Sequence, residues 1–156
     1  TLASGKNSRT ALPEVEPGPQ PQAFDLYGER QVLYVEDNRS NCEIIGAMLA
    51  FRPQINLTYS HSCQDAKRVL QNETIDLVLM DIHLPDGSGV DLATWIRDQI
   101  SDRIPVIFVS ADAAQLTQTD LGADNVVARL SKPLDLNQTL STIDQWLNQQ
   151  PQTQVQ

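Results

Sequence analysis

Polar side chains that could share one chemical task follow four of the five short apolar runs in this sequence. The first run ends in Glu36 and Asp37, the third in Asp81, the fourth in Ser110 and the fifth in Lys132. Three clustered carboxylates repel one another and stay ionised together only beside a cation. Carboxylate oxygens favour Mg²⁺ or a similar ion, and a cation, a lysine and a hydroxyl together suit the oxygens of a phosphoryl group. One carboxylate would then be a nucleophile that forms an acyl phosphate, and Asp81 is the best candidate because it closes the most apolar run.

The apolar runs have the composition of strands buried on both faces of a parallel sheet. The five expected strands are 31–36, 55–60, 75–81, 105–110 and 125–131. Helical apolar spacing fills the intervals between them, so we predict a doubly wound α/β domain. Ligands of such open parallel sheets bind outside the carboxyl ends of the strands, which is where the polar side chains lie.

Five helices are expected to alternate with these strands. The first two are predicted to begin at capping boxes, 40–43 and 62–65, in which the leading serine accepts a backbone N–H. Two later segments, 92–100 and 136–147, carry apolar stripes. The weakest helical pattern is 112–121, which is polar and has few apolar anchors.

Composition narrows the possible classes of protein. The chain has 156 residues, a net charge of −9 and two cysteines without CxxC spacing. We therefore expect no nucleic-acid groove, which needs clustered Lys and Arg, and neither a disulfide scaffold nor a zinc cluster. No apolar run approaches the roughly 20 residues of a membrane span. We also expect no signal peptide, because residues 1–30 contain no apolar stretch of the kind that such peptides carry. The expectation is a cytoplasmic domain over 30–148, with a flexible Pro-rich linker at 1–29 and a disordered Gln-rich tail at 149–156.

Taken in order, these motifs resemble the response-regulator receiver domain of two-component and phosphorelay signalling. The residues that carry the resemblance are Glu36-Asp37, Asp81, Ser110, Lys132-Pro133 and the loop 81–89 with its Pro and Gly positions. The resemblance covers about 30–148 and implies a flavodoxin-like (βα)5 fold with five parallel strands in the order 2-1-3-4-5. The opening 35–41 is similar to receivers fused to hybrid sensor histidine kinases, and the Pro-rich leader fits a C-terminal receiver of such a parent.

The resemblance also implies a role for each of these residues. Asp81 would accept a phosphoryl group from a phosphohistidine of a histidine kinase or a histidine-phosphotransfer domain. Lys132 would pair with the phosphoryl group, and Ser110 would hydrogen-bond its oxygens. The implied ligands of Mg²⁺ are the carboxylates of Glu36, Asp37 and Asp81 and the backbone carbonyl of His83. Such a domain would catalyse its own phosphorylation and a slow hydrolysis.

Three further positions concern partners and switching. The resemblance implies that Asn38 and the first helix face the helix bundle of the partner. It also implies a cis peptide bond before Pro133. Receivers often carry Tyr or Phe three residues before the lysine, as the switch partner of the Ser110 position, and this chain has Arg129 there.

Several other interpretations stay open at this point. The chain could be a stand-alone response regulator that acts through a binding partner. It could also be a pseudo-receiver that only docks, an alternative that stays open because Arg129 stands where receivers often carry an aromatic switch residue. A phosphatase of the aspartyl-nucleophile class would need a second Asp where His83 stands. Asp81 and His83 could also form a metal pair, although we expect His83 to offer its carbonyl. The oligomeric state and a membrane anchor elsewhere in a parent protein are left open.

Overall fold

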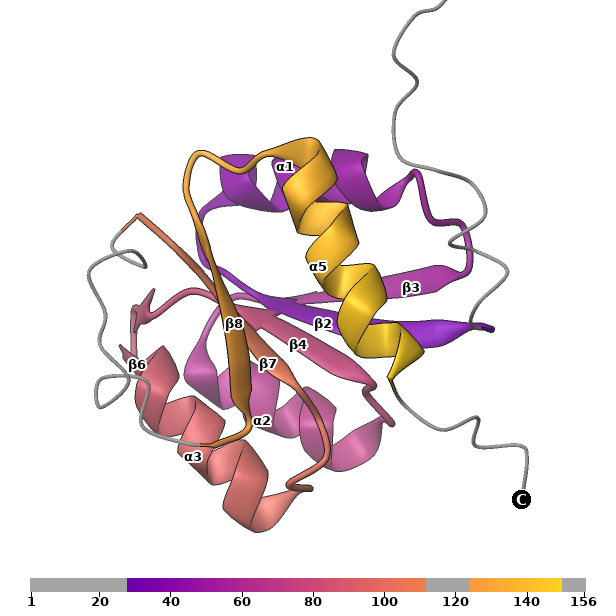
Figure 1. Cartoon of the computed structure of the whole chain (residues 1–156). Helices are drawn as coiled ribbons and strands as arrows, with labels where there is room; N and C mark the ends of the chain where they lie inside the picture. The colour runs from indigo at the N-terminus through magenta and orange to yellow at the C-terminus, as the bar shows by residue number, and fades with distance from the viewer. Residues whose placement is uncertain (1–27, 112–123, 150–156) are drawn as a thin grey trace, which may run out of the picture.

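The computed structural model describes residues 28–111 and 124–149 of the chain, and Figure 1 shows their arrangement. The strands are β2 (Arg30–Val35), β3 (Ile55–Ser60), β4 (Leu77–Met80), β5 (His83–Leu84), β6 (Gly87–Ser88), β7 (Val106–Ser110) and β8 (Val126–Ser131). The helices are α1 (Arg39–Leu49), α2 (Cys63–Asn72), α3 (Gly89–Gln99) and α5 (Leu136–Asn148). The helix predicted over 112–121 lies outside the described residues, as do most of the predicted linker and tail.

Five parallel strands form the main sheet, in the order β3-β2-β4-β7-β8. This is the order 2-1-3-4-5 of the five predicted strands, so the doubly wound fold is confirmed. Every residue of β4 and β7 is buried, as expected for strands covered on both faces. The carboxyl ends lie in register, with Val35 opposite both Ser60 and Met80 and with Ser110 opposite Ser131. The polar residues after these strands therefore meet at one edge.

Helices cover both faces of the sheet and bury a separate apolar cluster on each (Figure 1). The helices α1 and α5 pack on one face, where Tyr34 and Leu140 are fully buried. On the other face α2 and α3 pack around Phe108 and Ile96. None of the helices within the described part of the chain is long and apolar enough to cross a membrane.

The first helix begins two residues earlier than its predicted capping box. Asn38 is the N-cap, and its side-chain oxygen accepts the N–H of Asn41 at 3.0 Å. The prediction that Ser40 caps α1 is wrong, because asparagine caps as well as serine and the earlier start adds a helical bond from Cys42 N to the Asn38 carbonyl. The second prediction is confirmed, since Ser62 caps α2 and accepts the N–H of Asp65 at 3.1 Å.

The loop after β4 is tied down on two sides. It folds back as a small antiparallel ribbon of β5 and β6, which the sequence analysis did not predict. Asp86 in this ribbon accepts N–H groups of Cys63 at 2.7 Å and Gln64 at 3.0 Å, at the start of α2, and these bonds lower the pKa of Asp86. At the other side a Cβ on Gly89 would overlap the backbone carbonyl of Asp81, so only glycine allows this close approach. Both constraints hold the backbone that follows Asp81.

A buried ion pair joins α5 to the segment between α1 and β3. The guanidinium of Arg52 donates to the Asp144 carboxylate in a forked arrangement, with Nε 3.0 Å from Oδ1 and Nη2 2.7 Å from Oδ2. The two side chains are only 3% and 12% exposed. A bidentate pair of this kind is specific in geometry, and removing one partner leaves an uncompensated charge in the interior.

We expect Arg52→Ala to lower the free energy of unfolding by about 3–5 kcal/mol, since Asp144 would lose its buried partner. Urea unfolding followed by far-UV circular dichroism measures this loss. Arg39→Ala is the matched control, because it removes the ion pair with Glu43, whose side chains are 92% and 71% exposed. That pair should contribute less than about 1 kcal/mol. Equal losses in the two variants would contradict the prediction.

Candidate functional site

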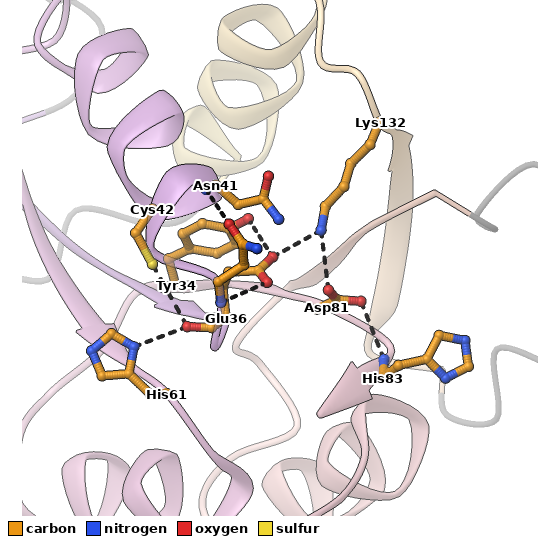
Figure 2. A network of polar contacts seen from close by, with 9 residues as sticks. Tyr34, Glu36, Asn41, Cys42, His61, Asp81, His83 and Lys132 are labelled. Carbon is orange, nitrogen blue, oxygen red and sulfur yellow. Dashed lines mark hydrogen bonds and ion pairs between the residues drawn. The ribbon is translucent and has the colours of Figure 1, made fainter. Parts of the chain in front are cut away.

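Three charged side chains meet at the carboxyl edge of the sheet (Figure 2). Lys132 Nζ, just beyond β8, donates to Glu36 Oε1 at 2.9 Å and to Asp81 Oδ2 at 3.1 Å. Glu36 follows β2 and Asp81 follows β4, so the amine joins the ends of three strands. The side chain of Glu36 is 1% exposed and that of Asp81 12%, which leaves Asp81 the more accessible carboxylate.

The charges of this site support one another. Burial by itself raises the pKa of Glu36, but the hydrogen bond and charge of Lys132 outweigh burial and hold that pKa below its ordinary value. Burial likewise lowers the pKa of Lys132, and its bonds to Glu36 and Asp81 raise the pKa above the usual value. Lys132 is therefore protonated and Glu36 ionised at neutral pH, and the amine offsets the repulsion between the two carboxylates.

Two further donors hold the Glu36 carboxylate. The hydroxyl of Tyr34 donates to Oε1 at 2.9 Å, and the backbone N–H of Asn38 donates to Oε2 at 3.2 Å. Burial and the neighbouring Glu36 raise the pKa of Tyr34, so its hydroxyl stays protonated. Tyr34 was not among the predicted site residues. The available signal was its position two residues before Glu36, because alternate residues of a strand lie on one face.

Asp81 has a second partner in its own loop. Its Oδ1 accepts the backbone N–H of His83 at 3.2 Å, and the imidazole ring of His83 points away from the carboxylate (Figure 2). This orientation does not bring the ring to Asp81 as the alternative of an Asp-x-His metal pair requires. The use of the His83 carbonyl as a ligand stays a prediction.

The other predicted residues lie around this centre. Ser110 is buried at the end of β7, and its carbonyl accepts the N–H of Lys132 at 3.2 Å. Asp37 is exposed beside Glu36. The bond between Lys132 and Pro133 is cis, as the resemblance implied. Arg129 is exposed on β8, opposite Phe108 of β7.

His61, which directly follows β3, also contacts the site, although the sequence motifs did not point to it. Its Nδ1 lies 3.0 Å from the backbone carbonyl of Glu36, and Cys42 Sγ lies 3.6 Å from the same oxygen (Figure 2). Burial raises the pKa of the Cys42 thiol, which therefore stays protonated at neutral pH. These contacts fix the backbone at the end of β2 from the side opposite Lys132.

The oxygen donors of the site suit a hard cation, but the described side chains do not form a preassembled metal site. Across 28–111 and 124–149, no group of three or more His, Cys, Asp and Glu side chains is placed to hold a metal ion. The carboxylates of Glu36 and Asp81 instead share the Lys132 amine. Mg²⁺ is usually bound by one or two carboxylates together with waters and phosphate oxygens, so it does not need three preassembled protein ligands. The all-oxygen donor set fits that mode of binding.

Comparisons with known proteins agree with this arrangement. A family model for the response regulator receiver domain matches residues 32–144. The polar-differentiation response regulator DivK of Brucella ovis is 29% identical over 119 residues, which cover 76% of this chain and 96% of DivK. The autoinducer 2 sensor kinase/phosphatase LuxQ of Vibrio vulnificus is 29% identical over 124 residues, which cover 77% of this chain and 14% of LuxQ.

Solved structures give the same answer for the fold. The receiver domain of the sensor histidine kinase PA1611 from Pseudomonas aeruginosa, crystallised with a magnesium ion in its active site cleft, has a TM-score of 0.67 and 29% identity, covering 79% of this chain and all of that one. A CheY-like receiver domain from Methylobacillus flagellatus has a TM-score of 0.66 and 26% identity, covering 77% and 99%. Because the family model spans most of the chain and these neighbours share its fold, the chain belongs to the response regulator receiver domains of two-component signalling.

Proposed function

We propose that Asp81 accepts a phosphoryl group from a phosphohistidine in a reaction that depends on Mg²⁺. The observation that carries this proposal is the position of Lys132 Nζ, 3.1 Å from Asp81 and 2.9 Å from Glu36. A lysine held between two carboxylates keeps a positive charge where the oxygens of an incoming phosphoryl group would gather. Asp81 closes the central strand and is the more exposed of the two carboxylates, which supports it as the acceptor.

The transfer would need little chemistry from the chain besides positioning. An oxygen of the Asp81 carboxylate would attack phosphorus while the phosphorus–nitrogen bond of the donor breaks and its electron pair returns to the imidazole. Lys132 would exchange its bonds to Glu36 and Asp81 for bonds to oxygens of the phosphoryl group and neutralise part of their charge. Ser110, at the end of the neighbouring strand, would donate its hydroxyl to another phosphoryl oxygen. Holding these groups in place is the main catalytic contribution.

The metal would bind next to the acceptor. The ligands that we propose are the carboxylates of Glu36, Asp37 and Asp81 and the backbone carbonyl of His83. Bound Mg²⁺ would offset the negative charge of these carboxylates and of the phosphoryl oxygens. The magnesium ion in the active site cleft of the PA1611 receiver supports this part of the proposal.

The response to phosphorylation would involve Ser110 and the strand beside it. Arg129 is exposed on β8, the edge strand, where an aromatic switch residue is often found in the family. Pro133 follows the cis bond that turns the chain from β8 toward α5. Phosphoryl transfer to Asp81 requires neither residue as a reacting group, so we propose that the departure at Arg129 alters signalling without preventing phosphorylation.

Incubation with a small phosphodonor and Mg²⁺ should add one phosphoryl group, about 80 Da, to the intact chain. Asp81→Asn should show no such gain, because the amide is not a nucleophile of this kind, and chelation of Mg²⁺ should abolish the gain in the natural sequence. Intact mass spectrometry measures both. Asp98→Asn is the matched control, since Asp98 is an exposed acid on α3 that pairs with Arg97.

The proposed acceptor would be wrong if the adduct survived in Asp81→Asn at the level of the Asp98→Asn control. An absence of adduct in the natural sequence, both with the small phosphodonor and with a phosphorylated histidine-phosphotransfer domain, would contradict phosphoryl acceptance altogether. The domain would then be the pseudo-receiver considered in the sequence analysis, which only docks to a partner.

One side of α1 suits a helical partner. Ile44 is 47% exposed on α1, and Phe51, in the turn just after the end of this helix, is 48% exposed. A hollow of about 370 Å³ lies beside this side of α1. Its lining residues are Tyr34, Asn41, Ile44, Lys132, Pro133 and Leu134. We propose that the helix bundle of a histidine kinase or histidine-phosphotransfer domain contacts this surface, with Asn38 at the end of α1 that faces Asp81.

We expect Ile44→Asp to slow phosphoryl transfer from a phosphorylated histidine-phosphotransfer domain by roughly tenfold, because a charge replaces an apolar anchor of the interface. Acceptance from the small phosphodonor should stay unchanged, since Ile44 does not contact Asp81. Rates measured by radiolabel transfer and intact mass separate the two effects. Gln71→Asp on α2, across the sheet, is the control. Equal slowing with both donors would contradict a docking role.

Two kinds of protein are compatible with this site. We propose that the domain is the receiver of a hybrid sensor histidine kinase in the cytoplasm, as the PA1611 and LuxQ matches support. The alternative is a stand-alone response regulator, because the matched region makes up 96% of DivK.

An immunoblot of the native host with an antibody against this domain distinguishes the contexts. A hybrid kinase should give a band far above 17.3 kDa, the mass of this chain. A single band near that mass would contradict the hybrid proposal and support the stand-alone alternative. Recombinant domain run on the same gel gives the reference position.

A further inference from the structure

Tyr34 carries a hydroxyl group that packing alone does not require. The residue is fully buried between the sheet and the layer of α1 and α5, where a phenylalanine would fill the same space. Its hydroxyl nevertheless reaches Glu36 Oε1 at 2.9 Å (Figure 2). A buried hydroxyl costs free energy unless it is hydrogen-bonded, so the contact with Glu36 is what makes a tyrosine tolerable at this position.

Glu36 accepts hydrogen bonds from three donors. Two of these donors are fixed in place, and the third would leave Glu36 during the proposed phosphoryl transfer. Tyr34 is fixed by its strand, and Asn38 donates from the backbone at the N-cap of α1. Lys132 shares its amine between Glu36 and Asp81. In the proposed reaction Lys132 turns to the phosphoryl group. Tyr34 would then be the remaining side-chain donor to Glu36 Oε1.

A glutamate also needs more restraint than an aspartate at a metal site. Its carboxylate lies one methylene farther from the backbone and rotates about one more torsion. A donor that fixes one oxygen leaves the other oriented at lower entropic cost when a cation arrives. Tyr34, two residues earlier on the same face of β2, is placed to do this.

We propose that Tyr34 is a positioning residue that holds the Glu36 carboxylate for the divalent cation, through the hydrogen bond from its hydroxyl to Glu36 Oε1. This inference rests on the proposed function, because it takes Glu36 as a metal ligand. In this proposal Tyr34 would contact neither the cation nor the phosphoryl group. Its effect on the reaction passes through Glu36, so it should change metal affinity before it changes the chemistry at Asp81.

The test is the affinity for Mg²⁺ in Tyr34→Phe, measured by isothermal calorimetry on the full chain without a phosphodonor. We expect the dissociation constant to rise about tenfold, as for other residues that orient a metal ligand. Tyr59→Phe is the matched control, because the Tyr59 hydroxyl donates to the Cys42 backbone carbonyl at 3.1 Å rather than to Glu36. It should bind Mg²⁺ like the natural sequence.

A double-mutant cycle separates positioning from a general effect of the variant on the fold. In a Glu36→Asp background the shortened carboxylate is withdrawn from the Tyr34 hydroxyl, so adding Tyr34→Phe should change the dissociation constant less than about twofold. If Tyr34→Phe weakened Mg²⁺ binding equally in both backgrounds, the hydroxyl would not act through Glu36 and the inference would be overturned.

A second measurement needs no variant. The buried hydroxyl proton of Tyr34 should be visible by NMR and should shift on titration with Mg²⁺, following the calorimetric binding curve. A natural chain that binds Mg²⁺ while this proton stays unmoved, or while Tyr34→Phe binds as tightly, would overturn the inference alone. A natural chain that binds no Mg²⁺ would overturn the proposed metal site and the inference together.

Discussion

A lysine placed between two carboxylates in a largely buried site is stable only when the geometry is good and the remaining polar atoms have partners. Lys132 meets these conditions, with its amine 2.9 Å from Glu36 and 3.1 Å from Asp81. Removing the amine would leave two acids close together at the end of the sheet. Removing either acid would leave the amine with a single carboxylate partner. The arrangement of strands and loops around the site can be understood as the framework that keeps these three charges together.

The parallel sheet supplies most of that framework. Neighbouring strands β2 and β4 put Glu36 and Asp81 side by side, whereas β8 is separated from β4 by β7. The lysine at the end of β8 therefore has to reach past the end of β7, where Ser110 lies, and its long side chain makes this possible. The loop after Asp81 is held by the hydrogen bonds of Asp86 to the start of α2 and by the close approach of Gly89 to the Asp81 backbone. Backbone that is fixed on both sides limits the movement of the acceptor.

Sequence reasoning was weaker where a contact depends on the exact path of the chain. It identified the five strands to within two residues, because continuous apolar runs are a local property. It placed the first helix cap at Ser40 instead of Asn38, since both residue types are good caps and only the observed start decides between them. It missed His61 and the buried pair of Arg52 and Asp144, whose partners lie on other elements or in the backbone. It also missed Tyr34, although its partner Glu36 follows only two residues later.

The sequence by itself determined the fold class, the strand order through the family resemblance, and the set of residues that gather at one edge, because hydrophobic pattern and motif order are written along the chain. The tertiary structure alone decided how those residues are joined. It paired Lys132 with two acids instead of leaving three carboxylates as a ready metal cage, and it added a buried hydroxyl to Glu36. The physical reason is that hydrogen bonds act over about 3 Å, a distance that only the packed positions of separate strands and helices can set.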